Sequence, residues 1–126
     1  MKHKIILGLF VITTMSCNRS KSEYATLKTE KTFDFGTISI HDTVNHVFEV
    51  KNTSDKKLEI SQIGTSCGCT GAIISDSIVS KNESAKIKVQ FIPKKDQVGQ
   101  INNSIVIEAN TNPPFTTIYI KGTVKE

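Results

Sequence analysis

Ala85-Lys-Ile-Lys-Val-Gln-Phe-Ile-Pro93 is the stretch that most clearly decides the fold. Apolar side chains stand at every second position, at Ile87, Val89 and Phe91, with lysine or glutamine between them. Successive side chains of a β-strand point to opposite faces, so this period of two is typical of a strand with one face in the core. The segment therefore predicts a strand in a sheet that is buried on one side.

The same alternation recurs along the chain after residue 30, and no convincing helical period of 3.6 appears. Polar clusters such as Asn52–Lys56 and Ser80–Ser84 separate the runs, as turns do. About seven short strands of this kind predict an all-β domain with an immunoglobulin-like β-sandwich fold. We expect the last run to form a sheet edge, where Lys121 would oppose pairing with another chain. The expected strands lie in Lys31–Gly36, Val44–Lys51, Lys57–Ile63, Thr65–Ile74, Ala85–Pro93, Gln100–Ala109 and Phe115–Val124.

The first seventeen residues are typical of a bacterial lipoprotein export signal. Lys2 and Lys4 form a basic start, and the apolar run Ile5–Ile12 is shorter than the roughly 20 residues of a membrane-spanning helix. Small Ser16 then precedes Cys17. We expect a signal peptide at 1–16, lipidation of Cys17, a flexible tether at 17–30 and one folded domain at 31–126.

Composition and motifs exclude several classes of function. The formal net charge of the 126-residue chain is +4, but Lys2 and Lys4 would leave with the signal, and Arg19 is the only arginine. So mild a charge, with so little arginine, does not predict a nucleic-acid partner. The sequence also lacks a phosphate-binding loop, a His-Glu-x-x-His motif and a Gly-x-Ser-x-Gly motif. We therefore expect no enzymatic activity, no catalytic residues and no cofactor.

Cys67-Gly68-Cys69 is the motif with the clearest chemistry. If lipid occupies Cys17, these two of the three cysteines remain as a pair in an exported protein. In an ideal strand their Cα atoms would be about 6.6 Å apart, at the upper end of the disulfide range. A positive φ at Gly68 would fold the segment more tightly and permit a bridge. The small ring would be strained, which favours reduction and makes the pair a candidate redox site.

Metal binding is a second interpretation of the same pair. Two thiolates on one face suit monovalent copper, whereas zinc requires four ligands. His41 and His46 are the histidines of the expected mature chain, and nothing in the sequence places them near Cys67. Because His46 alternates with apolar residues, we expect it to be a partly buried strand histidine rather than a ligand.

Simple packing is a third interpretation, since free cysteine behaves as a small hydrophobic residue. The glycines around the pair, Gly64, Gly68 and Gly71, indicate a tightly bent crossing between sheets. Structural, redox and metal roles for Cys67 and Cys69 all stay open on the sequence.

The order of the segments resembles one bacterial family. The carrying stretches are FDFGTI (33–38), VFEVKNTSDKKLEI (47–60), SCGCT (66–70), IKVQF (87–91), GQINNSIVIEANTNPP (99–114) and IYIKGTV (118–124). They are similar to the family called "domain of unknown function 1573" from about Phe33 to Val124. The resemblance implies an exported, often lipid-anchored immunoglobulin-like domain, common in Bacteroidetes and similar to Hydin-type and major-sperm-protein domains. It implies no established activity.

Two short motifs look like the Asp-Ser/Thr-apolar acceptor that Bacteroidetes use for O-glycosylation. They are Asp42-Thr43-Val44 and Asp76-Ser77-Ile78, so Thr43 and Ser77 are candidate glycosylation sites. The alternative is that both are ordinary turn residues before strands.

These observations predict a lipid-anchored cell-envelope protein that acts as a binding or scaffolding module. Its partners would be the membrane, through the anchor, and an unidentified envelope protein. The alternative is an envelope thiol-redox or copper-handling accessory protein that uses Cys67 and Cys69. Asn18-Arg19-Ser20-Lys21 follows Cys17, in place of the acidic stretch that directs some Bacteroidetes lipoproteins to the surface. We therefore expect the outer membrane, and its periplasmic face rather than the cell surface.

Overall fold

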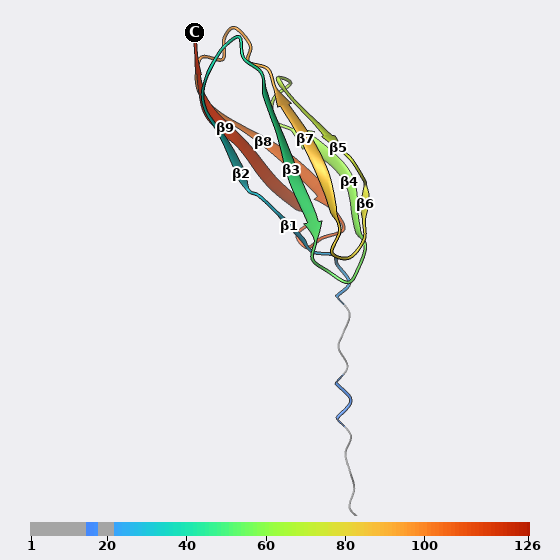
Figure 1. The fold of residues 1–126 in the computed structure, drawn as a ribbon. Coiled ribbons are helices and arrows are strands. Elements are labelled where there is room, and N and C mark those ends of the chain that lie inside the picture. The colour runs from blue at the N-terminus through green and yellow to red at the C-terminus, as the bar shows by residue number, and fades with distance from the viewer. Residues whose placement is uncertain (1–14, 18–21) are drawn as a thin grey trace, which may run out of the picture.

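Two β-sheets stack face to face in the computed structural model, which describes residues 15–17 and 22–126 (Figure 1). The described part of the chain is all-β, which confirms the predicted fold class. Each of the seven expected segments contains a strand, although in Thr65–Ile74 the strand β5 covers only the second half, and two short strands, β1 and β6, were not expected. The strands are β1 (Leu27–Thr29), β2 (Thr32–Ser39), β3 (Val44–Asn52), β4 (Leu58–Thr65), β5 (Thr70–Ile74), β6 (Ile78–Val79), β7 (Ser84–Phe91), β8 (Gly99–Ala109) and β9 (Phe115–Lys125).

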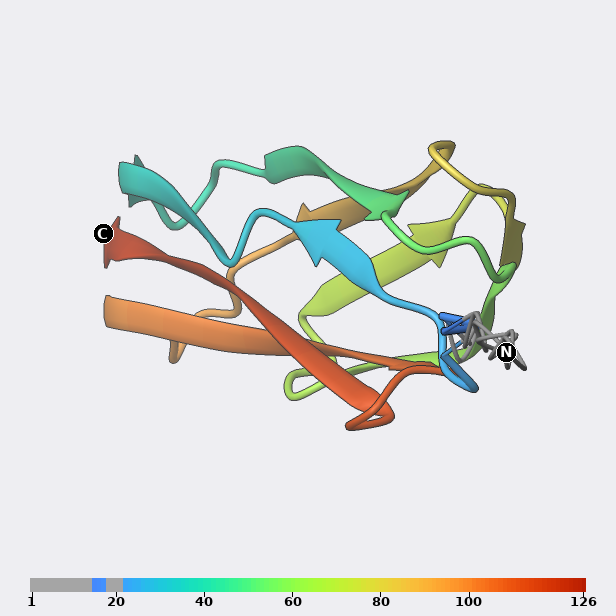
Figure 2. The ribbon, with the colours of Figure 1, turned by 90° about the horizontal axis from the view of Figure 1, so that it is seen from below.

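One sheet has the order β1-β3-β7-β5, and the other has the order β2-β9-β8-β4-β6. Figure 2 shows β8 and β9 side by side in one layer. The expectation that the last strand forms an edge is wrong, because β2 pairs with β9 in parallel and covers it. Lys121 consequently lies in the interior of the sheet, between Asp34 and Asn102. The apolar pattern of β9 could not reveal this, since it fixes the buried face and not the neighbouring strand.

The core fills the space between the sheets. Ile87, Val89 and Phe91 all point into it, as their alternation predicts. Each large apolar side chain buried in this way contributes about 1.5–3 kcal/mol to the free energy of folding. The largest fully buried side chains are Phe48, Phe91, Leu58, Ile87, Ile105, Ile107, Ile118, Ile120, Val50 and Val124, with Asn52 among them.

The sandwich begins before Lys31, so the C-terminal part of the segment expected as a tether is structured. Ala25 is buried and forms a bridge with Thr111, and β1 pairs with β3. A strand of three residues offers too few positions for a period of two to be visible. The described part of the chain does not include residues 18–21 of the predicted tether or residues 1–14 of the predicted signal.

A bulge in β2 explains the Phe-Asp-Phe-Gly opening of the domain. The pairing of β2 with β9 shifts between Asp34 and Thr37, and Gly36 has a φ of 72°. The Gly36 N–H donates a hydrogen bond of 2.8 Å to Oδ1 of Asp34, whose side chain is exposed. Glycine adopts this left-handed conformation without steric cost, so the bulge requires it. Phe33 and Phe35, the residues before and after Asp34, both pack against the core.

Candidate functional site

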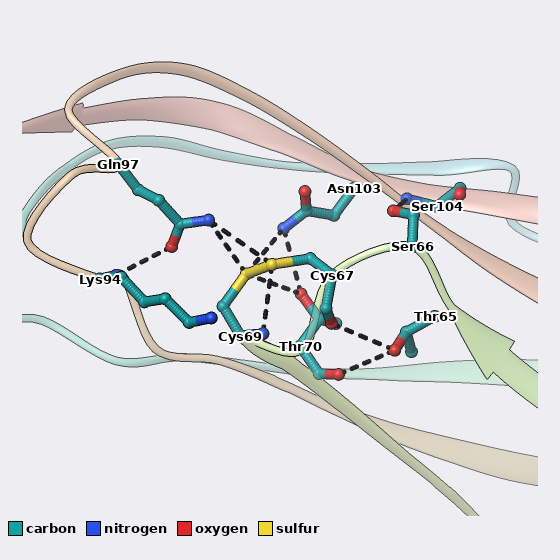
Figure 3. The surroundings of a disulfide bond; sticks show 9 residues. All are labelled: Thr65, Ser66, Cys67, Cys69, Thr70, Lys94, Gln97, Asn103 and Ser104. Atoms are coloured by element: carbon teal, nitrogen blue, oxygen red, sulfur yellow. Dashed lines mark hydrogen bonds between the residues drawn. A yellow bond between two sulfur atoms is a disulfide. The ribbon is translucent and has the colours of Figure 1, made fainter.

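A disulfide joins Cys67 to Cys69 in the connection between β4 and β5 (Figure 3). Their Cα atoms are 5.2 Å apart, closer than in an ideal strand. The two cysteines lie in a turn, in which the Thr70 N–H donates a 3.1 Å hydrogen bond to the Cys67 carbonyl. We expected one strand over Thr65–Ile74, and that expectation is wrong. The segment comprises the last residue of β4, a turn and β5.

Gly68 does not adopt the positive φ that the sequence suggested as one way to permit the bridge. Among the described glycines, Gly36 and Gly99 have positive φ values and Gly68 does not. A Cβ atom placed on Gly68 would meet no atom within 4 Å. The turn itself, rather than the freedom of glycine, brings Cys67 and Cys69 within bridging distance.

Two side-chain amides point at the disulfide sulfurs from other parts of the chain. Nε2 of Gln97 lies 3.2 Å from Sγ of Cys69 and 3.5 Å from Sγ of Cys67. Nδ2 of Asn103 lies 3.7 Å from Sγ of Cys69 and donates a 3.1 Å hydrogen bond to Oγ1 of Thr70. The backbone N–H of Cys69 lies 3.1 Å from Sγ of Cys67. Each sulfur therefore faces N–H donors, which would stabilise negative charge on it.

The turn is fastened to the rest of the sandwich. Its first residue, Ser66, exchanges two hydrogen bonds with Ser104 of β8, at 3.0 and 2.9 Å. Thr65 Oγ1 donates to the Cys67 carbonyl at 3.2 Å. Oε1 of Gln97 accepts a 2.8 Å bond from the Lys94 N–H, which orients its amide towards the sulfurs (Figure 3). The donors are thus held in place before any reaction.

The disulfide lies at the end of the sandwich away from the entry of the chain. Val44 of β3, Phe91 of β7 and Thr70 of β5 form one row at that end. Leu27 of β1 pairs with Asn52 at the other end, where the chain enters the sheet. In Figure 1 this entry lies at the bottom and the C-terminus at the top. A lipid anchor at Cys17 would therefore leave the disulfide on the side remote from the anchor.

The histidines do not join this site. His46 is partly buried, as expected: its ring stacks on Phe33 at 3.6 Å and meets Phe48 edge-on at 4.6 Å. Its Nε2 lies 3.0 Å from Oε2 of Glu30. His41 is exposed in the turn before β3. Within residues 15–17 and 22–126, no group of three or more His, Cys, Asp or Glu side chains is arranged to hold a metal ion.

The three predicted modification sites are all exposed. Cys17 is a free, exposed cysteine. Thr43 lies just before β3, and Ser77 lies just before β6. In the described part of the chain, none of the elements is a helix with the length and apolar character needed to cross a bilayer.

A second surface lies on the outer face of the four-stranded sheet. Val47 of β3, Lys88 of β7 and Ile73 of β5 form one row across it, and the two apolar side chains are 47% and 73% exposed. Beside this row, Gly71 faces Gln90 and lacks a side chain, which leaves a hollow of about 520 Å³. We call this surface, Val47, Gly71, Ile73, Lys88 and Gln90, the outer face. β5 is also the last strand of its sheet.

Sequence reasoning missed both amides at the disulfide. Asn103 had a detectable signal, because it stands at the position of β8 that alternates with the core residues Ile105 and Ile107. A polar side chain in such a register needs a polar partner, here Thr70 and the sulfur of Cys69. Gln97 lies in the loop between β7 and β8 and had no comparable signal.

These features define an immunoglobulin-like sandwich of the kind found in PapD-like domains. Similar folds occur in a protein of unknown function from Porphyromonas gingivalis W83 (17% identity, TM-score 0.74) and in PapD-like domain 7 of human CEP192 (12%, 0.65). The first match covers 82% of this chain and 49% of the Porphyromonas protein, so this chain spans about half of that protein's length. The second covers 99% of both chains.

Residues 26–124 match the model of the family described as protein of unknown function (DUF1573), and the chain belongs to that family. This confirms the resemblance seen in the sequence. The secreted serine protease VesC from Vibrio cholerae also contains a similar fold, at 10% identity, with a TM-score of 0.62 and coverage of 78% of this chain and 23% of the protease. Likenesses at these identities establish the fold alone. The chain has no significant match among curated proteins.

Proposed function

We propose that this protein is a lipid-anchored, non-enzymatic binding module of the cell envelope, which holds an extended segment of a partner protein. The observation that carries the proposal is the row Val47–Lys88–Ile73, which exposes two apolar side chains on either side of a lysine. Exposed apolar groups that gather around a hollow are typical of interaction sites.

The edge strand β5 indicates how the partner would bind. It pairs with β7 on one side and ends the sheet on the other. Edge strands present backbone N–H and C=O groups that an extended peptide can pair with, while pockets on the sheet read its alternate side chains. An added strand would bring its own side chains next to Ile73 and the hollow at Gly71.

The charge of the outer face selects the chemistry of the partner. Lys86 and Lys88 both project from β7 on this side, and both are exposed. Glu49 lies opposite Lys86 on β3, whereas Lys88 lies between two apolar residues. An extended segment with one apolar side chain and neighbouring Asp or Glu residues would therefore complement the face.

The predicted leader and Cys17 support the anchored location, which we propose to be the periplasmic face of the outer membrane. The exposure of Cys17 is compatible with lipidation. In the full chain, Cys17→Ser should move the protein from the membrane fraction to the soluble fraction. Strong labelling of the protein on intact cells would overturn the periplasmic assignment.

Site-specific photocrosslinking in the source bacterium tests the binding proposal. A photoreactive residue at Ile73 should give one discrete crosslinked product, and Lys88→Glu should greatly reduce it. The matched controls are a photoreactive residue at Gln62, exposed on the other sheet, and Lys125→Glu, exposed at the end of β9. Peptide mapping should place the crosslink in an acidic, extended segment. Equal products from Ile73 and Gln62, or none from Ile73, would contradict the proposal.

Thiol–disulfide exchange is a second candidate function, because amides of Gln97 and Asn103 face the sulfurs at one end of the molecule. Copper handling, the other form of this alternative, would first require reduction of the bridge to two thiols. Counting free thiols and bound copper on protein purified without reductant or chelator separates the two. Protein with no free thiols and no bound metal would favour thiol–disulfide exchange over copper handling. Protein with two free thiols and stoichiometric copper would favour copper handling.

A further inference from the structure

We propose that an incoming thiol attacks the sulfur of Cys67 and that Cys69 leaves as a thiolate, which Gln97 and Asn103 stabilise. The inference rests on the second candidate function, exchange at the Cys67–Cys69 disulfide, and assigns different roles to its two sulfurs. The co-reactant is a thiol, either a small molecule or a cysteine of a partner protein.

Access distinguishes the two cysteines. Cys69 is 8% exposed and belongs to the core cluster, while Cys67 is only partly buried and packs against that cluster from outside it. The Cys69 carbonyl is also fixed to the Ile92 N–H at 3.0 Å, which ties this residue to the chain beyond β7. A nucleophile must approach along the line of the S–S bond, so we infer that it reaches the sulfur of the more exposed residue, Cys67.

The surroundings of Cys69 suit a leaving group. Its sulfur faces Nε2 of Gln97 at 3.2 Å, Nδ2 of Asn103 at 3.7 Å and Oγ1 of Thr70 at 4.0 Å. These donors come from the loop before β8, from β8 and from β5, and they are already in position in the disulfide form. A charge that develops on Cys69 is therefore met by preorganised N–H groups, which lowers the barrier to its departure. The sulfur of Cys67 shares Gln97 at the longer distance of 3.5 Å and has one backbone N–H.

The exchange balances without any further reagent. The thiolate of the first thiol forms a bond to Sγ of Cys67, the Cys67–Cys69 bond breaks, and its electron pair stays on Sγ of Cys69. A second thiolate then attacks the external sulfur of the mixed disulfide and releases Cys67 as a thiolate. Both protein sulfurs take up protons from solvent, so two thiols become one disulfide and the protein gains two electrons.

The test uses the full chain with Cys17→Ser, in which Cys67 and Cys69 are the remaining cysteines. Oxidised protein is mixed with glutathione, quenched in acid after milliseconds and digested with pepsin at low pH, which halts further exchange. Mass spectrometry then locates the glutathione adduct. In parallel, the rate of reduction is measured for Gln97→Glu, which keeps the Oε1 acceptor for Lys94 but replaces the donor amide by a carboxylate. Gln62→Glu makes the same change at an exposed position of β4.

We expect the adduct on Cys67, reduction about tenfold slower in Gln97→Glu, and an unchanged rate in Gln62→Glu, since a hydrogen bond to a charged group is worth about one such factor. An adduct mainly on Cys69 would overturn the inference and leave exchange itself intact. An adduct on Cys67 with an unchanged rate in Gln97→Glu would overturn the role of Gln97. Failure of glutathione to reduce the protein at all would overturn the exchange function. The adduct position is measured on unaltered surroundings, so it stands even where a variant folds poorly.

Discussion

The aromatic ring of Phe35 lies over Gly122, in the space that a side chain on that residue would occupy. Phe35 belongs to β2 and Gly122 to β9, which pair in parallel. The same ring contacts Phe91 of β7, with centroids 5.6 Å apart, and so connects the two sheets. The bare backbone of Gly122 is therefore what allows β2 to lie against β9 and place Phe35 across the core.

Gly122→Ala should destabilise the protein by about 2 kcal/mol, because the new Cβ would overlap the Phe35 ring and lie 2.7 Å from the Gly36 carbonyl oxygen. Urea unfolding followed by circular dichroism measures the change. Gly64→Ala is the matched control, since a Cβ there meets nothing within 4 Å and should be neutral or slightly stabilising. Equal free energies of unfolding for the two variants would contradict this account of β2 packing.

Gly36→Ala should cost about 1–2 kcal/mol for a different reason, namely the positive φ of 72° at the β2 bulge. Gly36→Asn should recover part of the loss, since asparagine tolerates the left-handed region better than alanine does. Gly68→Ala, in the disulfide turn, lacks this constraint and should leave the free energy of unfolding nearly unchanged. A loss in Gly68→Ala as large as in Gly36→Ala would show that our description of the turn is wrong.

Asn52→Ala should cost about 2–4 kcal/mol, because this fully buried side chain satisfies several groups at once. Its Nδ2 donates to the carbonyls of Lys56 and Val79 at 2.8 and 2.9 Å, and its Oδ1 accepts the Ser54 N–H at 2.9 Å. Removing it leaves buried backbone groups without partners. Asn102→Ala, exposed on β8, is the control and should change stability by less than about 0.5 kcal/mol. Thermal unfolding of both variants gives the comparison.

Strands whose alternation extends over several residues could be predicted from sequence, as β7 demonstrates. Their burial is a local property, because a period of two fixes which face is apolar. Which strands become neighbours depends on contacts between distant segments. The interior place of β9 follows from the Gly36 bulge and the fit of Phe35 over Gly122, and neither is visible as a period. The short strands β1 and β6 are defined by their pairing with β3 and β4, and neither is long enough to show an alternating pattern in the sequence.

The candidate site was also predictable from the sequence only in part. The sequence indicated that Cys67 and Cys69 are a chemically distinctive pair. It did not reveal the turn that contains them, because a turn of so few residues is too short to show in the alternation of apolar and polar residues. Gln97 reaches the disulfide from 28 positions beyond Cys69, a contact that only the packed loop between β7 and β8 creates. The outer face was not predicted either. In the sequence Ile73 is one apolar residue among several, and only the structure shows that it is exposed and that β5 lies at the edge of its sheet.

Removal of the disulfide distinguishes a structural bridge from one that reacts. A bridge that closes a loop of only three residues limits the unfolded chain little, so Cys67→Ser/Cys69→Ser should fold and lose about 1.5 kcal/mol. Ile105→Ala, in the fully buried core, should cost more, about 3 kcal/mol, and Cys17→Ser should have no effect because Cys17 is exposed. Urea unfolding of the three full-chain variants tests the order. If the double serine variant unfolded while Ile105→Ala stayed folded, the bridge would be essential to the fold, and the exchange function would lose its basis because reduction would destroy the domain.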